Sequence, residues 1–206
     1  LVLTLDLQIL GQRHADIRNG LSIPLKIKLS NLFDLLSKPS WCYQMARTKN
    51  RTFGNVMGHV KDITNLNSLT KWVQDQFDTR LNWDDVKRIK DWWGGKLIIK
   101  GIMDPDDAKM AQKCGADALV VSNHGGRQLD GVNSSISTLP EIKKAVSNID
   151  VLMDGGISSG QDILKAIAMG AEGVMIGRSF VYGLSAGGKE GVTKSLEILN
   201  KELDMT

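Results

Sequence analysis

Short apolar runs recur at intervals along the sequence. Val2–Asp6, Lys96–Lys100, Ala118–Ser122, Asp150–Asp154 and Gly173–Ile176 are each brief and rich in aliphatic residues, which is typical of buried strands. Helices are predicted in the segments between the last four of these runs, so strands alternate with helices. This alternation predicts an α/β fold in which helices cover a parallel sheet.

Helix start signals support the same alternation. Asp104-Pro105 opens a helix that runs toward Gly115, and Asn82 caps a helix that ends at Trp92-Trp93. Further helices are predicted at about residues 69–77 (capped by Ser68), 139–147, 159–169 and 190–205. From the second strand on, strand ends fall at about residues 100, 122, 154 and 177. This repeat is typical of a (β/α)8 barrel or of an open doubly wound sheet.

The composition is that of a globular chain. The 206 residues are 42% hydrophobic and 24% charged, which excludes a disordered tail, and no apolar run approaches the roughly 18 residues of a membrane span. Cys42 and Cys114 are too few for a disulfide framework and are expected to be free, buried thiols. The sequence starts inside a predicted core strand without an initiator Met, so we expect it to be truncated.

The stretch of about residues 21–65 interrupts the alternation and is predicted to be a long insertion. The window from Arg18 to Arg51 holds seven basic residues and one acidic residue, although the net charge of the chain is only +3. Pro24 can open a helix whose apolar residues share one face, namely Leu25, Leu29, Leu32, Phe33 and Leu36. A basic amphipathic helix is typical of a membrane-surface element, and a packed helix with a solvated basic side is the alternative. Binding to nucleic acid is disfavoured, because the sequence has no recognised binding motif or stacking platform.

Polar residues follow every predicted strand, at the end where barrels and doubly wound sheets bind ligands. The first strand leads to Thr4, Asp6 and Arg13, and the second ends in Lys100. The later strands lead into Ser122-Asn123-His124-Gly125-Gly126-Arg127, Asp154-Gly155-Gly156 with Gly160, and Gly177-Arg178. Scattered surface polarity would seldom follow every strand, so we expect a site at this edge.

The last two loops suit a phosphate group. Gly155, Gly156 and Gly177 allow the backbone to approach an anion, and N–H groups at helix starts point toward it. Arg178 can add a bidentate contact. Tight turns are the alternative explanation for these glycines, and their spacing does not match the G-x-G-x-x-G of dinucleotide-binding domains.

His124 is the candidate base, because histidine accepts a proton near neutral pH. Asp6 can stabilise its imidazolium from another strand end, and the guanidinium groups of Arg127 and Arg13 suit a carboxylate. Lys100 suits negative charge on a cofactor, and a Schiff base is the competing role. No pair of His or Cys has metal-ligand spacing, so no metal site is expected.

The run SNHGGRQLDG, Ser122–Gly131, resembles the signature of the FMN-dependent α-hydroxy acid dehydrogenases and oxidases. The resemblance extends through Leu1–Arg18, Asn82–Asp107 and Asp150–Ala186. It implies that residues 1–206 are part of a TIM barrel that binds FMN at its C-terminal face, with this chain supplying the fourth to eighth βα units. We therefore expect three strands to precede Leu1, and we expect the chain alone to be inactive and prone to aggregation at its open strand edges.

The resemblance also assigns roles to residues. It makes His124 the base, Asp6 its partner, Arg13 and Arg127 the substrate-binding arginines, and Lys100 the lysine beside the flavin N1 and C2 oxygen, where the reduced flavin is negative. The implied FMN contacts are Thr4, Lys100, Ser122, Asp154, Gly155, Gly156, Ser158, Gly177 and Arg178. Many members have an arginine at the position of Ser158. In this chain the serine cannot make the charge-assisted phosphate contact of that arginine, which is typically worth about 1.5–3 kcal/mol.

The long insertion is similar to that of the bacterial respiratory L-lactate and mandelate dehydrogenases, and in mandelate dehydrogenase it is associated with membrane attachment. The resemblance implies oxidation of an L-2-hydroxy acid, foremost L-lactate to pyruvate, with electrons passed to a quinone or cytochrome. It also implies a homo-oligomer, a tetramer, on the inner face of the cytoplasmic membrane. The alternatives are (S)-mandelate or glycolate as substrate, oxygen as acceptor, and a non-catalytic remnant that binds no flavin.

Overall fold

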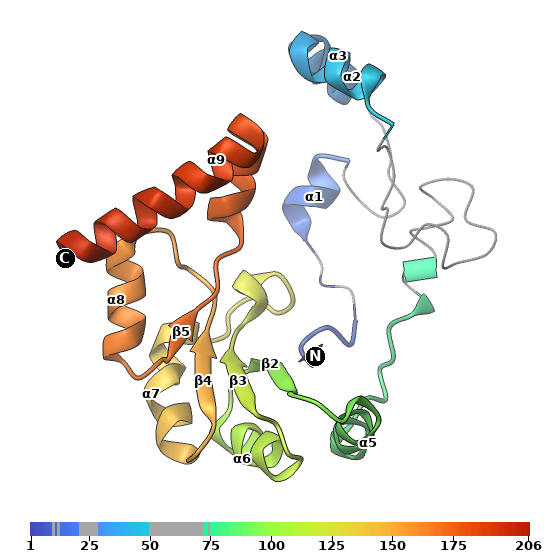
Figure 1. Ribbon diagram of the computed structural model, residues 1–206. Helices are drawn as coiled ribbons and strands as arrows, with labels where there is room; N and C mark the ends of the chain where they lie inside the picture. The colour runs from blue at the N-terminus through green and yellow to red at the C-terminus, as the bar shows by residue number, and fades with distance from the viewer. Residues whose placement is uncertain (10, 12, 21–28, 50–71, 74) are drawn as a thin grey trace. The chain divides into compact units, whose positions relative to one another are not determined.

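The computed structural model of the chain describes residues 1–9, 11, 13–20, 29–49, 72–73 and 75–206 (Figure 1). The chain divides into two compact units, Leu1–Gly11 with Asp78–Thr206, and Gln12–Phe77. The first unit contains the sheet, and the second contains the predicted insertion. The start of the helix predicted from Pro24 and the start of the helix predicted at 69–77 lie outside the described residues.

Five parallel strands form the sheet of the first unit. They are β1 (Val2–Thr4), β2 (Ile98–Ile102), β3 (Ala118–Val121), β4 (Asp150–Met153) and β5 (Gly173–Val174). Their order in the sheet is their order in the sequence. A doubly wound sheet reverses its strand order at a switch point, whereas a barrel adds each strand beside the one before it. The described strands show no reversal, so the doubly wound alternative is excluded and the barrel-type α/β class is confirmed.

Helices follow the strands and cover one face of the sheet (Figure 1). In chain order they are α5 (Trp83–Trp93), α6 (Pro105–Lys113), α7 (Ser135–Ala145), α8 (Gly160–Ala168) and α9 (Arg178–Met205). Helix α6 packs on β2, α7 on both β3 and β4, α8 on β5, and α9 on α8. The connections from β2 to β3, from β3 to β4 and from β4 to β5 therefore each place a helix on the same side of the sheet.

The predicted start signals form caps. Asn82 accepts hydrogen bonds from the amides of Asp84 and Asp85, and the Asp85 side chain accepts one from the Asn82 amide. This reciprocal arrangement satisfies backbone donors that the first helical turn leaves unpaired. Asp104 caps α6 in a similar way, with Pro105 as the first helical residue.

The two faces of the sheet carry different side chains. The side chains that pack against the helices are almost completely buried, with 0–2% exposure at Ile99, Ile102, Leu119, Val121, Val151 and Met153. The intervening residues point to the opposite face, because side chains alternate along a strand. On that face Thr4 pairs with Lys100, and Lys100 with Val120. Ser122 and Asp154 follow at the carboxyl ends of β3 and β4, so polar predicted residues gather at one edge.

Several element boundaries differ from the predictions. Strand β1, predicted at Val2–Asp6, ends at Thr4. The second strand, predicted at Lys96–Lys100, spans Ile98–Ile102, because it continues through a bulge at Gly101. Helix α7, predicted from residue 139, begins at Ser135. Its first turn carries buried polar side chains, and the Thr138 hydroxyl donates to the Ser135 carbonyl oxygen at 3.2 Å. A polar first turn of this kind shows no apolar periodicity in the sequence.

The final helix also starts earlier than expected. We predicted it from Glu190, but α9 begins at Arg178 and contains a break at Gly187 and Gly188, whose backbone angles are not helical. Glycine is a poor helix former, so the glycine-rich stretch hid the first part of this helix. Strand β5 is shorter than predicted and consists of two residues, Gly173–Val174.

The second unit contains three described helices, α1 (His14–Arg18), α2 (Leu29–Leu36) and α3 (Pro39–Arg47). The described part of the predicted apolar face is exposed, at 52–76% for Leu29, Leu32, Phe33 and Leu36. Trp41 and Tyr43 of α3 are exposed as well. Within the described ranges, no helix has the length and apolar character needed to cross a membrane.

Candidate active site

Lys100 lies at the centre of a polar cluster built by three adjacent strands. Its Nζ is 3.0 Å from Oδ2 of Asp154 and donates a 2.8 Å hydrogen bond to Oγ of Ser122. The Lys100 and Asp154 side chains are only 13% and 19% exposed. A partly buried charge needs such partners, because desolvation would otherwise disfavour it. The cluster therefore holds a cation in a fixed position at the strand ends.

His124 forms a second pair with Asp6, which follows β1. The Nδ1 atom of His124 is 3.0 Å from Oδ1 of Asp6, and the two side chains are 25% and 16% exposed. If Asp6 accepts the proton of Nδ1, the tautomer leaves Nε2 of His124 with a free lone pair. The arrangement can thus orient a histidine to accept a proton at Nε2 and stabilise the resulting imidazolium.

The backbone around His124 is held in an unusual conformation. His124 has a φ of 56°, in a region that non-glycine residues rarely occupy and in which strained residues cluster at functional sites. The Ser122 hydroxyl accepts a hydrogen bond from the His124 amide at 3.1 Å, and the Asn123 side chain accepts one from Gly125 at 3.0 Å. Ser122 therefore connects the Lys100 cluster to the His124 turn.

Glycine loops follow β4 and β5. Gly155 and Gly156 have φ values of +89° and +82°, and nothing lies within 4 Å of the position that a Cβ would take at Gly156 or Gly177. The loop backbone is therefore open to an approaching group. Arg178 follows directly as the first residue of α9.

The Ser158 side chain is used by the cap of α8. Its amide and hydroxyl both donate to Oδ2 of Asp162, at 3.1 and 3.0 Å, and the Ser159 amide donates to the same oxygen. The hydrogen bond from the Ser158 amide is the main reason that the pKa of Asp162 lies below its ordinary 3.8. Ser158 thus stabilises the start of α8, which the family resemblance did not lead us to expect.

A groove of about 980 Å³ runs along these strand ends. Its polar lining includes six of the residues predicted for the site, Lys100, His124, Arg127, Asp154, Ser158 and Arg178, and its glycine wall includes Gly155, Gly156 and Gly177. Met175, Ile176 and Phe180 supply an apolar wall. The volume is at the upper end of the roughly 300–1,000 Å³ typical of ligand sites.

Other predicted residues lie beside the groove or outside this unit. Ser122 is fully buried beneath the groove, and Asp6 touches it only through His124. Thr4 lies next to Lys100 in the sheet. Arg13 belongs to the second unit, so its predicted place beside the substrate stays a prediction.

Two residues with a structural part in the site were not predicted. Asn123 ties the His124 turn to the following loop, since its Nδ2 donates to the Asn133 carbonyl oxygen at 3.2 Å. An Asn directly before His-Gly-Gly is itself a turn signal, so the sequence contained the necessary information. Gly101 contacts Asp6, and nothing in the sequence around a single strand glycine would have indicated that contact.

The chain is similar to known proteins along its whole length. A sequence profile described as FMN-dependent dehydrogenase matches residues 1–206. The L-lactate dehydrogenase of Allorhizobium ampelinum is 43% identical over 205 residues, covering 98% of this chain and 54% of that protein. The L-lactate dehydrogenase of Haemophilus influenzae (strain PittEE) is 42% identical with the same coverage. The chain therefore spans about half the length of the curated relatives it matches.

Solved structures show the same relationship. A crystal structure of (S)-mandelate dehydrogenase, described as a monotopic membrane protein, matches 100% of this chain and 54% of its own with a TM-score of 0.93 and 34% identity. A mandelate oxidase structure matches 98% of this chain and 49% of its own, with a TM-score of 0.71 and 32% identity.

Proposed function

Because the chain belongs to the FMN-dependent dehydrogenase family, we propose that the protein oxidises an L-2-hydroxy acid, foremost L-lactate to pyruvate. The observation that carries this proposal is the Asp6–His124 pair at 3.0 Å, which opens into the same groove as Lys100 and Arg127. The identity of 42–43% with L-lactate dehydrogenases supports lactate as the substrate.

The residues of the groove fit FMN. Gly156 and Gly177 leave open backbone where a phosphate needs N–H donors, and Arg178 adds a cation. Oδ1 of Asp154 is buried and, among the described residues, has no hydrogen-bond partner, so it suits a ligand hydroxyl such as those of the ribityl chain. Lys100 brings a positive charge into the groove, where it would suit the negative charge of a reduced flavin. When bound, FMN supplies the acceptor for the two electrons that the substrate loses.

His124 removes a proton from the substrate through Nε2, either from the α-carbon or from the hydroxyl group. The Asp6 carboxylate at Nδ1 keeps the ring oriented and stabilises the positive charge that the proton creates. Arg127, in the wall of the groove, binds the substrate carboxylate through its planar guanidinium. Arg13 is proposed as the second carboxylate ligand.

We further propose that the second unit attaches the protein to the inner face of the cytoplasmic membrane, where a quinone or cytochrome takes up the electrons. The support is the exposed apolar side of α2, formed by Leu29, Leu32, Phe33 and Leu36, together with two basic residues of α3, Lys38 at its N-cap and Arg47 in its last turn. Apolar and basic groups together favour binding at an anionic bilayer surface. The description of the mandelate dehydrogenase as a monotopic membrane protein agrees with this proposal.

Anaerobic flavin reduction tests the proposed reaction. The protein as its gene encodes it is loaded with FMN and mixed with L-lactate, (S)-mandelate or glycolate, and the loss of flavin absorbance is recorded. We expect L-lactate to reduce the flavin fastest and to yield one pyruvate per flavin. Failure to retain FMN after reconstitution would support a non-catalytic protein instead. Rapid peroxide formation in air would support an oxidase in place of a dehydrogenase that uses a membrane acceptor.

A further inference from the structure

Strand β2 contains a bulge beside the proposed site. Ile99 and Ile102 both lie in the helix-covered core, at 0% and 2% exposure, although a regular strand would turn residues three apart to opposite faces. The register between β2 and β3 shifts between Lys100 and Ile102. Gly101 is the extra residue, and its φ of +100° is one that L side chains rarely adopt.

Gly101 lies directly against Asp6. A Cβ at this position would be 2.7 Å from Cγ of Asp6, 2.8 Å from its Cβ and 3.0 Å from its backbone nitrogen. Real Cβ atoms do not approach other atoms this closely, so any side chain at residue 101 would displace Asp6. The position of the Asp6 carboxylate, which pairs with His124, therefore requires glycine at residue 101.

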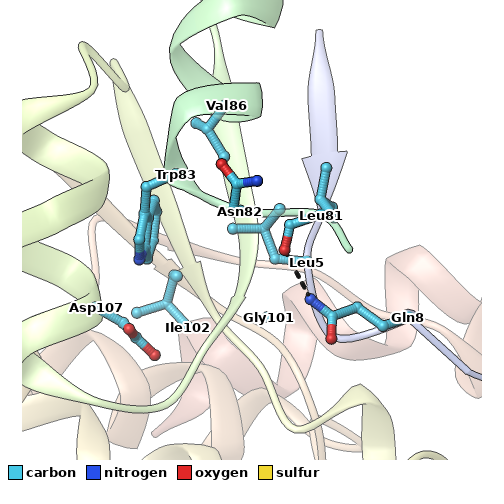
Figure 2. Close-up of a pocket in the computed structure, with 9 residues that line it drawn as sticks. All are labelled: Leu5, Gln8, Leu81, Asn82, Trp83, Val86, Gly101, Ile102 and Asp107. Carbon is cyan, nitrogen blue, oxygen red and sulfur yellow. Dashed lines mark hydrogen bonds between the residues drawn. The ribbon is translucent and has the colours of Figure 1, made fainter. Parts of the chain in front are cut away.

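Asp6 has little room to retreat, because its neighbours in the chain are fixed. The Leu5 amide donates a 2.9 Å hydrogen bond to the Lys100 carbonyl oxygen. On the other side, Nε2 of Gln8 donates to the Leu81 carbonyl oxygen at 3.2 Å (Figure 2). Leu5, Gln8 and Gly101 line the same pocket of about 200 Å³ (Figure 2). The loop after β1 is thus attached both to the bulge and to the start of α5.

We propose that Gly101 is a positioning residue for the reaction: the bulge in β2 provides the seat that holds Asp6 against Nδ1 of His124. This inference rests on the proposed function of His124 as the base. Lys100, the residue before the bulge, keeps regular register with β1 and β3 and pairs with Ser122 and Asp154. Gly101, the bulged residue, lies against Asp6.

The test compares Gly101→Ala with Gly94→Ala in the FMN-loaded protein as its gene encodes it. Gly94 also has a positive φ, +64°, but nothing lies within 4 Å of its missing Cβ, so this variant controls for backbone strain. We expect Gly101→Ala to lower kcat about 100-fold, since a displacement of about 1 Å in a catalytic group has costs of that order. We expect KM to change little and Gly94→Ala to keep the wild-type kcat.

A double-mutant cycle separates positioning from general destabilisation. If Gly101 acts through Asp6, then Gly101→Ala causes almost no further loss of kcat in an Asp6→Asn background, whereas an equal loss in both backgrounds would overturn the proposal.

Thermal unfolding provides a second measurement, which does not depend on catalytic activity. Asp6→Gly removes the two side-chain atoms that a Cβ at residue 101 would meet most closely, although the φ of +100° and the contact with the backbone nitrogen of residue 6 remain. Gly101→Ala should therefore lower Tm less in the Asp6→Gly background than in the wild type, and an equal loss of Tm in both backgrounds would contradict the proposal. A wild-type protein that fails to oxidise any hydroxy acid would instead refute the proposed function, whatever the unfolding cycle shows.

Discussion

The two units of the chain use apolar residues in opposite ways. In the first unit, Leu119 and Val121 of β3 are completely buried and pack with the helices. In the second unit, Leu32 and Phe33 of α2 are 52% and 69% exposed. The first pattern stabilises a fold that holds charged residues at fixed distances. The second leaves an apolar surface of the kind that marks an interaction site, so the same residue types serve stability in one unit and, as we propose, attachment in the other.

Replacing one leucine in each unit gives the largest expected contrast in stability. Leu119→Ala leaves a cavity in a closed core and should lower the free energy of unfolding by about 2–5 kcal/mol. Leu32→Ala should leave that free energy almost unchanged and should weaken binding to anionic lipid vesicles. Urea titration and vesicle co-sedimentation measure the two effects. A large stability loss from Leu32→Ala would show that its side chain belongs to a core.

Ion pairs should show the same contrast. The Lys100–Asp154 pair is mostly buried at 3.0 Å, whereas Lys38 and Asp34 are 61% and 72% exposed at 3.9 Å. Lys100→Met leaves a buried carboxylate unpaired and should cost about 3 kcal/mol. Lys38→Met should cost less than about 1 kcal/mol. Equal losses in urea titrations of the two variants would contradict the central position given to the Lys100 cluster.

A substitution at Ser158 should strengthen an interaction, whereas the preceding substitutions weaken one. Arginine at this position would add a charge-assisted contact to the proposed phosphate site, so Ser158→Arg should tighten FMN binding about tenfold, equivalent to roughly 1.5 kcal/mol. Flavin fluorescence titration measures the affinity, and the gain should shrink at high salt. Ser147→Arg, on an exposed loop, is the control for added charge. An unchanged affinity would mean that Ser158 does not face the phosphate.

The smallest predicted effect depends on pH. The Lys90 side chain, the Leu97 amide and Lys96 all donate to Asp117 and hold its pKa far below the ordinary 3.8. A carboxyl with a depressed folded pKa stabilises the fold above its unfolded pKa, and this contribution is lost as the pH falls from about 5 toward the folded value. Tm should therefore fall less on acidification in Asp117→Asn than in the wild type. An equal fall of Tm with decreasing pH in the two proteins would show that Asp117 does not contribute to the acid sensitivity of the fold.

Much of the sheet could be predicted because its burial pattern is local. Ala118–Ser122 and Asp150–Asp154 contain apolar runs, and the observed strands β3 and β4 differ from them by one residue each. The bulge at Gly101 could not be predicted, because it depends on contact with Asp6 across 95 residues of sequence. The role of Ser158 in the α8 cap was missed for another reason, since the family resemblance drew attention to the arginine that it replaces. Local patterns thus predict the elements, while long-range contacts determine how the site is held.

The central claim is that His124, oriented by Asp6, takes a proton from the hydroxy acid. Single-turnover reduction of bound FMN by L-lactate tests it most directly, in wild type, in His124→Ala, and in His14→Ala as a control on exposed α1 of the second unit. Loss of a general base typically costs about 10²–10⁴-fold in rate, so reduction should slow by that factor in His124→Ala and proceed normally in His14→Ala. Reduction of the flavin at the wild-type rate in His124→Ala would contradict the account.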